Sequence, residues 1–117
     1  MEYLQNPFMA YAEIPPYRAR LPYTDEEFST TYWADFRICR GDTAAIKDTF
    51  KRCQPLAKDD AQYGAELSLA LNELSWAYAE THPETARLFS DLWYEWHDWC
   101  VCHYKDKDLE YYLHIVD

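Results

Sequence analysis

The chain is poor in glycine and in basic residues, and it has no long apolar run. Two glycines in 117 residues leave little material for a phosphate-cradling loop, and neither a dinucleotide fingerprint nor a nucleophile elbow occurs. No apolar run approaches the roughly 20 residues of a membrane-spanning helix. The eleven basic residues face 21 acidic ones, which gives a formal net charge of -10. We therefore expect neither direct nucleic-acid binding nor attraction to an anionic membrane.

The first residues carry neither the basic start nor the apolar region of a secretory signal, so we expect a cytoplasmic protein. In that compartment the four cysteines are expected to be reduced thiols: Cys39, Cys53, Cys100 and Cys102. Hydrophobic residues make up 49% of the chain and aromatic residues 18%, which is ample for a core. The length predicts a single domain over residues 1–117.

Proline spacing divides the chain into two parts. Residues 1–23 contain four prolines and five aromatic side chains spread along the segment, which predicts an extended strap across a core. Residues 24–117 are expected to form that core from helices. A capping box at Thr24–Glu27 starts the first helix, and Gly41 is placed to end it.

Further capping signals predict the remaining helices. Asp42 or Thr43 begins a second helix that Pro55 is expected to end, and Asp59 or Asp60 begins a third. Apolar residues on two sides of the third helix predict that it is the central one. Pro83 begins a fourth helix, whose buried arc is dominated by aromatic residues: Leu88, Phe89, Leu92, Trp93, Trp96, Trp99, Cys100 and Tyr104.

Two segments fit either helix or strand. Residues 32–39 recur at helical spacing but also alternate, and so do residues 109–116. The preferred fold class is therefore mainly α: a compact domain of three to four helices with an N-terminal strap. The alternative is α+β, with a small two-stranded sheet formed by 32–39 and 109–116.

The clearest sequence pattern is a pair of carboxylate rows at seven-residue spacing. Between residues 59 and 98 nine acids accompany a single strong base, Arg87. The first row runs through Asp59, Glu66, Glu73 and Glu80, and the second through Glu84, Asp91 and Asp98. Seven residues make about two helical turns, so each row predicts an acidic stripe along a helix. The first row flanks apolar residues and is the preferred contact surface, while the second is interpreted as solvated.

A cluster of histidines and cysteines near residue 100 offers a metal or thiol alternative. His97, Cys100 and His103 have zinc-competent side chains. However, Cys100 and Cys102 point about 200° apart on a helix and cannot share one ion. A core thiol with flanking histidines is the favoured interpretation, and we expect no cofactor.

These patterns favour binding over catalysis. We expect a non-catalytic inhibitor or adaptor that presents its carboxylates to a basic protein. The sequence leaves the oligomeric state open. The candidate contact residues are Glu66, Glu73, Glu80, Trp76, Asp91 and Asp98. Two alternatives stay open: a nucleic-acid mimic that blocks a DNA- or RNA-binding protein, and a metal-binding or thiol enzyme that uses His97, Cys100 and His103. In composition the chain resembles small acidic accessory proteins of bacteria and their mobile elements.

Overall fold

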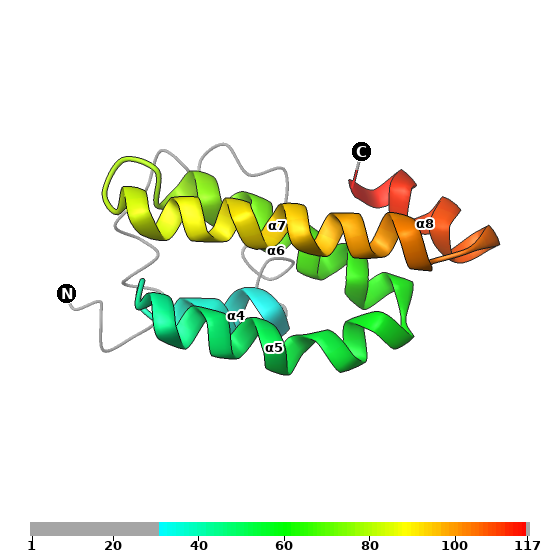
Figure 1. Cartoon of the computed structure of the whole chain (residues 1–117), viewed down its shortest axis with the longest axis horizontal. Helices are drawn as coiled ribbons and strands as arrows, with labels where there is room; N and C mark the ends of the chain where they lie inside the picture. Colours follow the sequence, from blue (N-terminus) through cyan, green and yellow to red (C-terminus); the bar gives the residue numbers. More distant parts are fainter. Residues whose placement is uncertain (1–30, 117) are drawn as a thin grey trace.

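The computed structural model describes residues 31–116, which form five α helices and no strand (Figure 1). With the labels of that figure, the helices are α4 (Thr31–Ile38), α5 (Thr43–Asp59), α6 (Ala61–Ala77), α7 (Pro83–His103) and α8 (Asp106–Val116). The mainly helical prediction is confirmed. The predicted strap over residues 1–23 and the helix start at Thr24 lie outside the described residues.

The alternative of a two-stranded sheet is excluded for both segments, because their burial follows helical spacing. In α4, Tyr32 and Phe36 are buried four residues apart, whereas Ile38 is 63% exposed although it would share their face in a strand. In the tail, Tyr112 is buried, whereas His114 is exposed although it would share the face of Tyr112 in a strand. The tail also forms a separate helix, because α7 ends at His103 and α8 begins only at Asp106.

The starts of α5, α6 and α7 agree with the capping chemistry. The Asp42 side chain accepts a hydrogen bond from the Ala45 backbone N–H at 2.9 Å at the start of α5. The Asp60 side chain accepts one from Gln62 N–H at 2.9 Å, and Asp60 also closes α5. Pro83 occupies the first turn of α7. Gly41, with φ +83°, lies in the turn between α4 and α5 as expected.

The prediction that Pro55 ends α5 is wrong, because the helix continues through it to Asp59. Pro55 is exposed, so its ring points away from the core. The turn that follows is fixed from outside the helix: Ala57 is fully buried, and its carbonyl oxygen accepts a hydrogen bond from the Tyr104 hydroxyl. Burial and this tertiary hydrogen bond offset the loss of one backbone donor.

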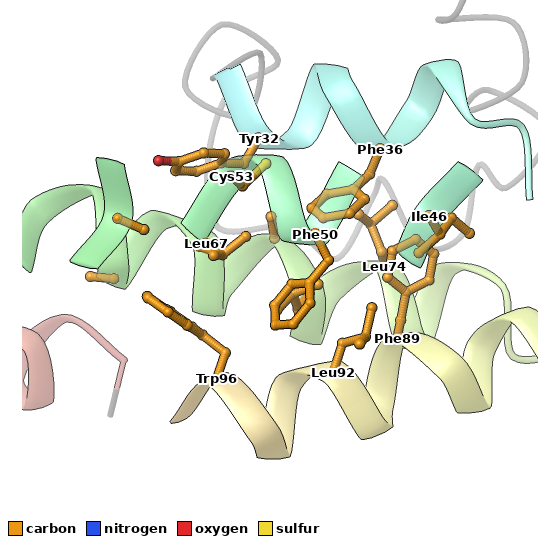
Figure 2. Packing of buried hydrophobic residues seen from close by; sticks show 14 of the residues in the cluster. Tyr32, Phe36, Ile46, Phe50, Cys53, Leu67, Leu74, Phe89, Leu92 and Trp96 are labelled. Atoms are coloured by element: carbon orange, nitrogen blue, oxygen red, sulfur yellow. The ribbon is translucent and has the colours of Figure 1, made fainter. Parts of the chain in front are cut away.

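Helix α6 is the central helix, as predicted, since it packs against each of the other four described helices. In Figure 1, α4 and α5 lie on one side and α7 on the other, with α6 between and behind them. Only Gln62 and Trp76 of α6 are exposed. Side chains of α4, α5, α6 and α7 converge in the core, where Phe36, Phe50, Leu74, Phe89 and Trp96 meet (Figure 2).

Three polar contacts connect the helices around this core. The Trp96 indole N–H donates a 2.9 Å hydrogen bond to the Gly64 carbonyl oxygen of α6. The Tyr112 hydroxyl of α8 lies 2.6 Å from Ser68 Oγ and 2.8 Å from His97 Nδ1, so α8 is bonded to both α6 and α7. Tyr112 and Ser68 are fully buried. In the part of the chain that is described, none of the helices is long and apolar enough to cross a bilayer.

Candidate interaction surface

Helix α7 has two opposite faces with different chemistry. Its buried residues are Thr85, Ala86, Phe89, Leu92, Trp96 and Cys100, which face α6 and α5. The opposite face carries six residues spaced alternately by three and four: Glu84, Arg87, Asp91, Tyr94, Asp98 and Val101. All six are exposed. We call this set the α7 outer row.

The α7 outer row is long and drifts only slightly around the helix. Its six positions are the a and d positions of a heptad repeat, and the residues buried against the core fall on the other positions. From Glu84 to Val101 it extends about 25 Å along the helix axis. A seven-residue helical repeat therefore places its three carboxylates roughly 10.5 Å apart.

The α7 outer row combines negative charge with exposed apolar surface. It carries three carboxylates and one guanidinium, and the exposed Glu95 lies beside it. At its middle Tyr94 is 65% exposed, and near its end Val101 is 41% exposed. Tyr94 makes an edge contact with Trp93 at 4.9 Å between ring centroids. A neighbouring ring thus supports an aromatic side chain that faces solvent, which is an arrangement suited to contact with a partner.

The carboxylate row on α6, the preferred surface from the sequence, is shorter than its spacing suggested. Asp59 is the last residue of α5, and Glu80 lies beyond the end of α6. Only Glu66 and Glu73 remain on the helix, and both are half-buried. Trp76 continues the same narrow strip and is 57% exposed. This row therefore presents two carboxylates at a packed flank.

The surroundings of Glu66 show how closely this flank is packed. Burial raises the pKa of the Glu66 carboxyl above its usual range, and a hydrogen bond from Gln62 offsets part of that effect. Burial likewise raises the pKa of Tyr32 on α4, and the charge of Glu66 adds to that rise. Glu66 thus lies close to α4 and carries an energetic cost when it is ionised.

The structure does not bring the predicted contact residues together on one face. Asp91 and Asp98 belong to the α7 outer row, on the side of α7 opposite α6. Glu66 and Glu73 lie on α6 itself. Tyr94 is central to the exposed surface but was not among the predicted contact residues. The signal for it was present in the sequence, since Arg87, Tyr94 and Val101 repeat at seven residues, three positions after the acids.

The histidine and cysteine candidates are distributed between core and surface. Cys100 is fully buried, and burial raises the pKa of its thiol to about 12, which disfavours a thiolate. His97 stacks on Trp93 and contacts the Tyr112 hydroxyl, and His103 Nδ1 lies 2.9 Å from the Trp99 carbonyl oxygen. Across residues 31–116 there is no group of three or more histidine, cysteine or acidic side chains that could hold a metal ion.

A shallow groove of about 300 Å³ lies between α5 and the second half of α7. Trp99 lines it, but the chain itself covers this ring: Trp96 and His103 stack with it, and the Lys58 ammonium lies 5.1 Å from its centroid. The walls carry Lys58 opposite Glu95 and Asp98. Because the groove carries charges of both signs and the Trp99 ring already contacts other side chains, its lining favours no particular class of ligand.

Comparisons with protein-family models, with curated proteins and with solved structures found no match to this chain.

Proposed function

We propose that this protein is a non-catalytic binding module that docks a basic protein partner on the α7 outer row. The observation that carries the proposal is the division of α7 into two faces. One face is committed to the core, and the other presents three carboxylates around an exposed tyrosine at regular intervals. The surface offers electrostatic attraction for association and an aromatic anchor for affinity.

The charge of the whole chain supports a basic partner. A net charge of -10 attracts cations over a Debye length and repels other acidic proteins, including further copies of the chain. On the outer row the attraction is local, because Arg87 is the single base among the exposed acids of α7. An inhibitor or adaptor is the form of activity that such a surface suits.

The nucleic-acid mimic receives less support from this geometry. Carboxylates roughly 10.5 Å apart are more widely spaced than phosphates along one DNA strand, so a second row would have to interleave with the first. The other candidate row, on α6, holds two half-buried carboxylates on a different helix. A protein partner with matching spacing is therefore the better-supported binding target.

Affinity capture from a lysate of the source cells at low and high salt tests the proposal. The bait is the wild-type chain, and the matched control is Asp91→Lys with Asp98→Lys, which changes two exposed positions. We expect a basic protein to be recovered at low salt by the wild type, to be lost at high salt, and to be absent from the control. The proposal fails if wild-type and control baits recover the same proteins.

A further inference from the structure

The spacing of the α7 outer row specifies the form of its partner as well as its charge. We infer that the docked element is an α helix with lysine or arginine at every seventh position and apolar residues between them. This inference rests on the proposed function and deepens it by naming the class of partner. It is argued from the pitch of the row, its apolar members and the charge of the chain.

The pitch of the row favours a helix over an extended segment. Carboxylates of the row repeat roughly every 10.5 Å, which is the distance between residues seven apart on another helix. Side chains on one face of a β-strand repeat about every 6.7 Å, so a strand would meet these three carboxylates out of step. A basic helix aligned with α7 meets all three at once, within the slight drift of about 20° per heptad.

The apolar members of the row favour helix-on-helix packing. Tyr94 and Val101 occupy the positions between the carboxylates, and they are 65% and 41% exposed. These are the positions that insert into the facing helix in a coiled coil. Arg87 holds the equivalent place at the other end of the row, where a partner would present an acidic or polar side chain. The row thus sets both a register and a direction for the partner helix.

A second copy of this chain does not fit the row. Two copies would each bring three carboxylates and one guanidinium to the interface, and each carries a net charge of -10. Like charges placed opposite one another disfavour association. A helix of opposite charge removes that repulsion and pairs each carboxylate, so charge complementarity selects a basic partner from another chain.

Synthetic peptides test this inference directly. The first peptide has three heptads with arginine at every a position, leucine at two d positions and glutamate at the terminal d position that would face Arg87, in a background of alanine and glutamine. The second has the same composition, but its arginines are six and eight residues apart and scatter around the helix. Fluorescence anisotropy of labelled peptide, titrated with the full chain at low and physiological salt, measures the two affinities.

We expect the heptad peptide to bind at least roughly tenfold more tightly than the rearranged one, and Asp91→Lys with Asp98→Lys to abolish that preference. Tyr94→Ala should lower the affinity for the heptad peptide and change the affinity for the rearranged peptide little. Equal binding of the two peptides would overturn the helical register and leave the basic-partner proposal standing. Failure of both peptides to bind would also overturn the helical partner, whereas the proposed function is tested separately by the capture experiment above.

Discussion

Two helices of this protein carry carboxylates at the same seven-residue spacing, yet their environments differ. On α6 the row shrinks to Glu66 and Glu73, which are half-buried on a helix that packs against four others. On α7 the row keeps all its members in solvent, with Tyr94 exposed among them. The same spacing therefore places carboxylates at a packed flank of α6 but on an exposed face of α7. The difference comes from where each helix is covered: α6 is packed on most sides, whereas one whole face of α7 is exposed.

The largest expected effect separates the two faces of α7 itself. Trp96→Ala removes a buried ring and its hydrogen bond to the Gly64 carbonyl oxygen, and should lower the free energy of unfolding by about 3–5 kcal/mol. Tyr94→Ala, two residues away, should change it by no more than about 0.5 kcal/mol. Urea denaturation followed by circular dichroism measures both. Similar losses for the two variants would show that the outer row also supports the fold.

A second, smaller effect tests whether α8 belongs to the packed side of the molecule. Tyr112→Phe deletes the hydroxyl that contacts Ser68 and His97, and leaves the buried Ser68 hydroxyl without that contact. We expect a loss of about 1–3 kcal/mol in the free energy of unfolding. Tyr111→Phe changes the neighbouring, exposed ring and is the matched control. If the control loses as much as Tyr112→Phe, the hydroxyl contacts do not hold α8.

The smallest effect concerns the pH dependence of the α6 row. Because burial raises the folded-state pKa of Glu66, its neutral form is favoured on folding, and the resulting stability is complete below the ordinary value of 4.5. That stability is lost as pH rises through the folded-state pKa. Glu66→Gln should therefore be more stable than the wild type at pH 7, with the gap closing in acid.

Denaturation midpoints of wild type and Glu66→Gln between pH 4 and pH 7 measure this gap. Glu95→Gln removes one charge from an exposed position of α7 and serves as the control for the change in net charge. A gap between Glu66→Gln and wild type that stays constant, or that grows in acid, would contradict the buried environment assigned to Glu66.

Much of the fold could be predicted from the sequence, because local chemistry decides it. The caps at Asp42 and Asp60 and the proline at the start of α7 act within a turn or two of the backbone. Periodicity also identified most of the aromatic core, including Phe89, Trp96 and Tyr104. These features depend on residues that lie close together in the sequence, so the sequence alone identifies them.

The sequence was wrong, or left alternatives open, where contacts between distant residues decide the outcome. Pro55 lies inside α5 because the turn after it is held by contacts of Ala57. Ala57 is buried, and its carbonyl oxygen accepts a hydrogen bond from Tyr104, which lies 47 residues further along the chain. Residues 32–39 and 109–116 carry both periodicities, and only their packing partners select the helix. The sequence placed the preferred contact surface on α6 but could not show that Glu66 and Glu73 are half-buried there, because their burial depends on the helices packed around α6.

The most direct test of the binding account removes two charges from each row and compares the losses. Asp91→Asn with Asp98→Asn alters α7, and Glu66→Gln with Glu73→Gln alters α6 by the same net charge. Isothermal titration with the purified protein captured by the wild-type bait gives the Kd of each variant. The account predicts that the α7 variant binds roughly tenfold more weakly and that the α6 variant binds like the wild type. Weaker binding by the α6 variant alone would place the interface on α6 and contradict the account.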